Sequence, residues 1–370
     1  MIIYYSMIAW VVIVAFAYAL YQQRSRSGLT NTAEAQPVSR IWAIITFAYI
    51  VFWVGIRSGF VDTAAYILGF EASSSSLADI KDVFASSLKS PGFSIFQIVF
   101  KSLISSDYHF FLMAIAIFQG YFVMETFRKY SDNFFFTTLL FLLSTDFTWM
   151  LNGIRQFIAV VAVFACIRLI EEKKWLLYCI VVLLASTVHT SALMMLPLYW
   201  IVSAKPWSIR VWLTTIAFVL CTLFADKFTS ILEDTLANST YAENIAQFAY
   251  DDGVNPLRLL VALVPVGLAF LCRHHIEADK DSNRLGILVN MSVLCAGLYL
   301  IGITTSGIMI GRLPIYFELS NFILLPCLFN RYFTVKSKRL LYLLCIFGYG
   351  LWFYIQRGGL YYISEITGVI

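Results

Sequence analysis

Long apolar segments separated by short polar ones recur along the whole chain. Most have about 15 to 20 residues, close to the length that an α-helix needs to cross a bilayer. Helices satisfy their own backbone hydrogen bonds where water is absent. The pattern predicts an all-α, polytopic integral membrane protein with about 12 transmembrane segments. The expected segments are 3–21, 41–56, 108–126, 134–150, 154–170, 175–188, 190–203, 211–225, 256–272, 286–303, 314–330 and 340–356.

Two stretches fit this pattern poorly. Residues 175–203 form either one long helix or two short segments that meet near His189. We favour two short segments, forming a hairpin or a broken helix, because a single crossing would invert the topology of every later loop. Residues 92–106 are too short and too polar to span, and they predict an interfacial helix on the outer face.

Composition agrees with a membrane environment. The 370 residues are 60% hydrophobic and only 13% charged, against about 25% charged residues in a typical soluble domain. The seven cysteines are scattered, without metal-ligand spacing, so we expect neither disulfides nor a structural metal. No basic face for nucleic acid and no cofactor-binding motif is evident.

The positions of positive charge predict the orientation. The first basic residues, Arg24 and Arg26, follow the first apolar segment, whereas a cleaved signal peptide would show the reverse order. With the N-terminus extracytoplasmic, 17 of the 26 lysines and arginines fall on the cytoplasmic side, as the positive-inside rule predicts. They are Arg24, Arg26, Arg40, Arg128, Lys129, Arg168, Lys173, Lys174, Lys205, Arg210, Arg273, Lys280, Arg284, Arg331, Lys336, Lys338 and Arg339. The chain is then a single transmembrane domain over residues 1–370, with extracytoplasmic loops near 57–107 and 226–256.

Five arginines lie on the disfavoured outer side, each at the end of a predicted segment. Any one of them could reach lipid phosphates from a helix end. Five together favour a phosphate-containing ligand, because guanidinium binds phosphate with two parallel hydrogen bonds. These residues are Arg57, Arg155, Arg258, Arg312 and Arg357.

Polar residues near these arginines are the candidates for a site. Asp62 is expected to cap the helix that carries Tyr66, paired with Arg57 or facing a ligand. The stretch from Asp146 to Tyr199 holds two further clusters. In the first, Asn152, Arg155, Gln156 and Ala159 have the spacing of one helical face, which is either a polar contact between helices or a binding surface.

The second cluster surrounds His189, which is flanked by Ser186, Thr187, Thr190 and Ser191. A lone histidine in such a place is either structural or a general base. Near the C-terminus, Arg312 and Tyr316 are four residues apart and Glu318 follows, which adds a weaker candidate for substrate binding.

At these residues the sequence resembles the EpsG-type branch of Wzy-like bacterial polysaccharide polymerases. Phe60-Val61 departs from the Gly-Thr-like pair expected before Asp62-Thr63. The motifs that carry the resemblance are Arg57…Asp62-Thr63…Tyr66, Asn152-Gly-Ile-Arg155-Gln156-x-x-Ala159, Glu171-Glu172-Lys173-Lys174, Ala185-Ser-Thr-Val-His189-Thr-Ser191-Ala192, Leu196-Pro197-Leu198-Tyr199 and Arg312-x-x-x-Tyr316-Phe317.

The resemblance implies a metal-independent membrane glycosyltransferase. Such an enzyme joins oligosaccharide repeat units carried on undecaprenyl pyrophosphate into O-antigen, capsule or exopolysaccharide at the outer (periplasmic) face of the bacterial inner membrane. Arg155, His189 and Asp62 are then the expected catalytic residues, and no cofactor is expected. The substrate-binding residues are expected to be Arg57, Tyr66, Asn152, Gln156, Arg312 and Tyr316.

The partners expected of such an enzyme are the lipid-linked glycan donor and acceptor, membrane lipid and a chain-length regulator protein.

Three other functions fit a membrane protein with outer arginines: a lipid-linked sugar transporter or flippase, a glycan ligase and an O-acyltransferase. A flippase would carry polar residues through the full depth of the membrane. Here they gather at the outer ends of the segments, which favours an enzyme.

Overall fold

The computed structural model describes residues 1–26, 37–85, 90–236, 253–305, 307 and 310–369. Within these ranges the regular structure is helical, and β-pairing is limited to isolated bridges. The all-α prediction is therefore confirmed. The helices are α1 (Ile2–Arg26), α2 (Arg40–Gly55), α3 (Thr63–Glu71), α4 (Ile80–Ala85), α5 (Pro91–Leu103), α6 (Tyr108–Tyr130), α7 (Phe134–Leu143), α8 (Ile154–Phe164), α9 (Ile167–Glu171), α10 (Trp175–Val188), α11 (Met195–Val202), α12 (Ile209–Leu223), α13 (Ala225–Leu236), α15 (Pro256–Leu271), α16 (Arg273–Ala278), α17 (Ser282–Thr304), α18 (Ile315–Tyr332) and α19 (Val335–Gln356).

Four helices in the described part of the chain, α1, α6, α17 and α19, are long and apolar enough to cross a membrane. Shorter apolar helices of 10 to 17 residues occupy most of the other predicted segments. The total of about 12 crossings therefore stays a prediction. Residues 237–252 of the predicted outer loop 226–256 lie outside the described residues. The described parts of this loop are α13 and residues 253–256.

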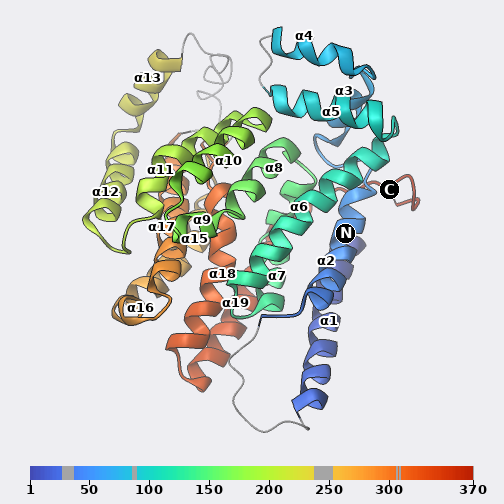
Figure 1. The fold of residues 1–370 in the computed structure, drawn as a ribbon. Helices are drawn as coiled ribbons and strands as arrows, with labels where there is room; N and C mark the ends of the chain where they lie inside the picture. The colour runs from blue at the N-terminus through green and yellow to red at the C-terminus, as the bar shows by residue number, and fades with distance from the viewer. Residues whose placement is uncertain (27–36, 86–89, 237–252, 306, 308–309, 370) are drawn as a thin grey trace. The chain divides into compact units, whose positions relative to one another are not determined.

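The chain divides into two compact units, which we describe separately. Unit 1 comprises residues 1–165, 183–192 and 333–370, and unit 2 comprises residues 166–182 and 193–332. In unit 1, α2 packs along α6, and α1 packs on both α2 and α7 (Figure 1). The indole of Trp352 in α19 donates a hydrogen bond of 3.0 Å to the carbonyl oxygen of Ser144, just after α7.

Contacts at the two ends of unit 1 agree with the expected sidedness. At one end, Arg40, Arg128 and Lys129 share the carboxylate of Glu125 at 3.2, 2.8 and 3.3 Å. All three cations were predicted to be cytoplasmic. At the other end, Arg357 donates to the hydroxyl of Tyr5 at 3.1 Å, which joins two residues predicted to be extracytoplasmic. Which end faces the cytoplasm stays a prediction.

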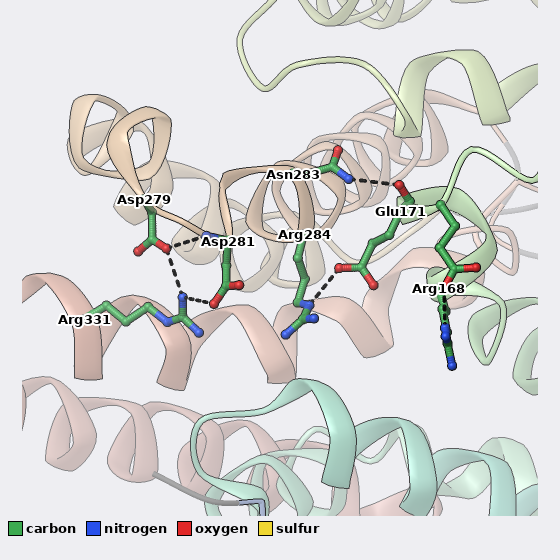
Figure 2. A network of polar contacts seen from close by, with 8 residues as sticks. Arg168, Glu171, Asp279, Asp281, Asn283, Arg284 and Arg331 are labelled. Atoms are coloured by element: carbon green, nitrogen blue, oxygen red, sulfur yellow. Dashed lines mark hydrogen bonds and ion pairs between the residues drawn. The ribbon is translucent and has the colours of Figure 1, made fainter. Parts of the chain in front are cut away.

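In unit 2, α17 is the central helix and packs against α12, α15 and α18. Figure 2 shows the polar network at one end of it. Arg284 of α17 pairs with Glu171 of α9 at 2.8 Å, and Arg331 of α18 pairs with Asp279 and Asp281 at 3.2 and 2.9 Å. Because these basic residues were all predicted to be cytoplasmic, the network joins loops that the topology places on one side.

The predicted break at His189 is confirmed. α10 ends at Val188, and a short 3-10 helix, Thr190–Met194, leads into α11. The rings of Tyr178 in α10 and Tyr199 in α11 lie 5.1 Å apart, and the Tyr178 hydroxyl donates to the carbonyl oxygen of Met195 at 3.5 Å. A continuous helix would separate the two tyrosines by about 30 Å, at about 1.5 Å per residue. The chain therefore turns back on itself as a hairpin.

Cysteine labelling of intact cells tests the predicted orientation. Ser75 lies in the predicted outer loop and is exposed, and His274 lies at the opposite predicted face and is also exposed. We expect a membrane-impermeant maleimide to label the Ser75→Cys variant directly and the His274→Cys variant only after permeabilisation. The unsubstituted protein is the control, because its seven cysteines are buried or half-buried thiols. The opposite labelling pattern would overturn the topology.

Candidate functional site

Arg155 stands at the start of α8, directly after a tight turn. The turn depends on Gly153, whose φ of +70° is a left-handed conformation that glycine adopts without strain. A Cβ added to Gly153 would also come within 2.8 Å of the ring of Trp149. Local sequence therefore places the guanidinium at a helix N-terminus. A cation there is electrostatically unfavourable, whereas an anion bound beside it would be stabilised by both the charge and the helix.

The Arg155 side chain is half-buried and lies among neutral groups. Its guanidinium carbon lies 6.0 Å from the ring centre of Tyr66 and 5.9 Å from that of Phe93. Nη1 is 3.5 Å from Ser90 Oγ, and Nε is buried with no hydrogen-bond partner in the ranges that the structure describes. Among the described residues, no carboxylate forms an ion pair with Arg155. The arrangement leaves hydrogen-bonding capacity and positive charge for an anionic ligand.

An aromatic cluster holds the two rings that face Arg155. Tyr66 packs on its edge, and Phe70 and Phe111 stack inside it with ring centres 4.3 Å apart. Its buried members are Phe70, Phe93, Phe100, Phe111, Leu112, Ile115 and Ile154. Because α3, α5, α6 and α8 all contribute side chains, the cluster positions Tyr66, Phe93 and Arg155 together.

The turn at His189 belongs to the same end of unit 1. Val188, the last residue of α10, packs on the aromatic cluster. Thr187 lies so close to the start of α5 that a Cβ on Gly92 would come within 2.2 Å of Thr187 Oγ1. His189 follows directly, and its Nδ1 shares a hydrogen bond of 2.7 Å with Ser191 Oγ. The structure thus brings the His189 turn to the cluster that holds Arg155.

The expectation that Asn152 shares a helical face with Arg155 is wrong. Because Gly153 turns the chain, α8 begins only at Ile154, and Asn152 lies in the preceding turn. Its Oδ1 is buried and accepts no hydrogen bond from any residue that the structure describes. Arg155, Gln156 and Ala159 do lie on α8, where Gln156 and Ala159 are buried.

The expectation that the Asp62 side chain caps α3 is wrong. Asp62 occupies the N-cap position of α3, but its side chain makes no capping hydrogen bond, and the residue is exposed. It forms no ion pair with Arg57, whose Nη1 and Nε instead donate to Val54 O at 2.6 Å and to Thr63 Oγ1 at 3.3 Å. The carboxylate is therefore available to solvent rather than committed to a cap.

Arg57 is fully buried, with 0% of its surface exposed. Burial lowers the pKa of Arg57 to about 10, and the phenols of Tyr362 and Tyr66 act in the opposite direction. The guanidinium therefore remains charged at neutral pH. Its Nη2 has no hydrogen-bond partner in the described part of the chain, and the partners of Nη1 and Nε are neutral oxygen atoms.

A comparison with protein-family models gives the decisive match. Residues 40–357 match the model described as the EpsG family. The chain belongs to the EpsG family. The match spans every candidate residue from Arg57 to Tyr316, and it confirms the resemblance seen in the sequence. Neither the search of curated proteins nor that of solved structures found a match.

Membership of the EpsG family indicates a membrane protein of polysaccharide biosynthesis. Two of the residues predicted to bind substrate in this EpsG-family protein lie in unit 2. Arg312 is exposed in the turn before α18, and Tyr316 is buried in the first turn of that helix. Their participation in substrate binding stays a prediction.

Three residues that support the Arg155 site were missed in the sequence. Ser90 and Phe93 contact Arg155, and Lys101 Nζ donates to the carbonyl oxygens of residues 70, 71 and 73 at the end of α3. Lys101 thereby fixes the helix that carries Tyr66. The only signal was that α5 carries polar residues in a segment too short to span, and this signal does not identify their partners.

Proposed function

We propose that this EpsG-family protein polymerises oligosaccharide repeat units carried on undecaprenyl pyrophosphate, at the outer face of the bacterial inner membrane. The observation that carries the proposal is Arg155, a half-buried cation at a helix N-terminus with no carboxylate partner among the described residues. Family membership supplies the polysaccharide context. A diphosphate on a lipid is an anion that suits such a position.

The proposed reaction is a glycosyl transfer. The hydroxyl oxygen of the acceptor sugar attacks the anomeric carbon of the donor chain, and the bond from that carbon to the pyrophosphate oxygen breaks. The acceptor proton passes to a base, and undecaprenyl pyrophosphate leaves with the bonding electron pair. Arg155 stabilises the negative charge that develops on the leaving group. Because the pyrophosphate is already a good leaving group, the step does not require a metal ion.

His189 is the proposed base. Donation from its Nδ1–H to Ser191 Oγ would make Nε2 the basic nitrogen. Asp62, an exposed carboxylate ahead of the helix that carries Tyr66, is a second proton acceptor at this end of unit 1. Tyr66, Asn152 and Gln156 are proposed to bind sugar or phosphate oxygens near Arg155.

Loss of the gene in its host tests the reaction type. Without the polymerase, single repeat units on lipid should accumulate on the outer leaflet, where an added glycosidase can cleave them in intact cells. A flippase would instead leave the repeat units on the inner leaflet, protected from the enzyme. Unchanged long-chain polysaccharide would contradict a role in polymerisation.

Replacing His189 tests the base. We expect His189→Ala to lower the rate of polymerisation by about 10²- to 10⁴-fold, the usual contribution of general acid–base catalysis, with little change in substrate KM. The matched variant Ser191→Ala removes the hydrogen bond to Nδ1 but keeps the imidazole, and it should lose much less activity. If His189→Ala lowers protein level and thermal stability in proportion to activity, the histidine is structural.

A further inference from the structure

The last residues of the chain fold back over Arg57. We call residues 360–369 the C-terminal strap. An antiparallel bridge joins Ile363 to Gly59, with N–H···O distances of 2.9 and 3.1 Å. Ser364 Oγ donates to the carbonyl oxygen of Ile56 at 2.8 Å. The strap thus fastens itself to both sides of Arg57 in the chain, and Figure 1 shows the C-terminus beside this part of unit 1.

Two further strap residues, Tyr362 and Glu365, contact unit 1 near Arg57. Tyr362 is buried, its hydroxyl donates to the carbonyl oxygen of Trp53 at 2.6 Å, and its ring packs edge-on against those of Trp53 and Tyr4. Glu365 accepts from the Tyr108 hydroxyl at 3.2 Å, and its backbone N–H donates to Ser58 Oγ at 3.0 Å. The strap lies beyond residue 357, where the family match ends.

The closed arrangement leaves several buried donors without acceptors among the described residues. These donors are Arg57 Nη2, Trp53 Nε1 and the Tyr4 hydroxyl. All three residues adjoin Tyr362 through ring or electrostatic contacts. Among the described residues, Arg57 forms no ion pair, so its charge has no compensating carboxylate. A buried cation without a counter-ion is costly, and this cost favours release of the cover.

We propose that the C-terminal strap is a gate over Arg57: it seals the guanidinium in the state seen here and must leave residues 56–60 before Arg57 can bind the substrate's phosphate groups. This inference rests on the proposed function, in which Arg57 is a substrate-binding residue. Release of the strap removes Tyr362 and Ser364 from Arg57 and its neighbours, while the hydrogen bonds from Arg57 to Val54 and Thr63 keep the guanidinium in place. Substrate binding is thereby coupled to movement of the strap.

A disulfide across the bridge can lock the strap. Gly59 and Ile363 exchange hydrogen bonds in both directions, a pairing that sets Cα atoms about 5.5 Å apart and suits a disulfide. A Cβ on Gly59 would lie 3.1 Å from Ile363 Cβ, so a small shift of the strap brings the two Cβ atoms to the separation usual in a disulfide.

We expect the oxidised Gly59→Cys/Ile363→Cys variant to make no long-chain polysaccharide in isolated membranes and to regain activity on reduction. The Ile363→Cys single variant is the control for the reagents. Normal chain lengths with the disulfide formed would overturn the gate.

Labelling gives a readout that does not depend on polymerase activity. Thr63 is fully buried and bonded to Arg57. With a small anionic methanethiosulfonate reagent, Thr63→Cys should react about fivefold faster when Ser364→Ala removes one strap hydrogen bond of ordinary strength. Labelling of buried Cys345 in the same molecules should not change. Equal rates at Thr63→Cys would contradict the gate, whereas faster labelling in a protein that polymerises nothing would reject the proposed function alone.

Discussion

Arg155→Ala is expected to abolish long-chain polysaccharide while single repeat units persist on their lipid carrier. The substitution removes the cation between Tyr66 and Phe93, and with it the proposed partner of the leaving pyrophosphate. Loss of one charge-stabilising group typically lowers kcat by about 10²- to 10³-fold. The measurement is the length distribution of polysaccharide by gel electrophoresis, together with the amount of lipid-linked repeat unit.

Arg155→Lys is the matched variant for this prediction. Lysine keeps the charge but loses the planar fork that binds two phosphate oxygens at once, so we expect an intermediate loss. Folding should be little affected by either change, because Arg155 is half-buried and, within the described part of the chain, its guanidinium forms one long hydrogen bond, to Ser90. Normal chain lengths in Arg155→Ala would remove Arg155 from the site.

Arg57→Met is expected to separate stability from activity. Arg57 is a fully buried cation whose bonded partners are neutral, so an apolar side chain of similar length relieves its desolvation cost. Replacing buried ionic groups by apolar ones is often neutral or stabilising by about 1 to 4 kcal/mol. Thermal stability in detergent should therefore hold or rise, while polymerisation falls by at least about tenfold because a phosphate-binding group is lost.

Arg128→Met provides the comparison. Arg128 pairs with Glu125 at the opposite end of unit 1, outside the proposed site. Its removal should lower thermal stability and leave the activity per folded molecule nearly unchanged. A loss of stability in Arg57→Met that matches the loss of activity would show Arg57 to be a structural residue.

The helical class and the break at His189 could be predicted because each follows from local sequence. Apolar length predicts a membrane helix, and the polar residues around His189 mark the place where hydrocarbon-compatible sequence stops. The sidedness of Arg40 and Arg128 followed from charge alone, and their shared contact with Glu125 agrees with it. Arg155 stood out because a cation at the outer end of a segment is costly.

The partners of these residues could not be predicted, because they come from distant parts of the chain. Ser90 is 65 positions from Arg155, and the strap residue Ser364 is 308 positions from Ile56. Helical spacing also misplaced Asn152, since periodicity does not show that the chain turns at Gly153 and that α8 begins only after this turn. Arg57 was expected either to face a ligand or to pair with Asp62, and only the folded chain shows that it is fully buried and that the strap bonds to residues on both sides of it.

Reconstitution tests the central claim most directly. Purified protein in proteoliposomes, supplied with undecaprenyl-pyrophosphate-linked repeat units from its host, should convert them into lipid-linked chains of two or more units. Each bond formed should release one undecaprenyl pyrophosphate, and protein carrying Arg155→Ala should do neither. Movement of intact repeat units across the bilayer, with no new glycosidic bond and no released lipid pyrophosphate, would contradict the account.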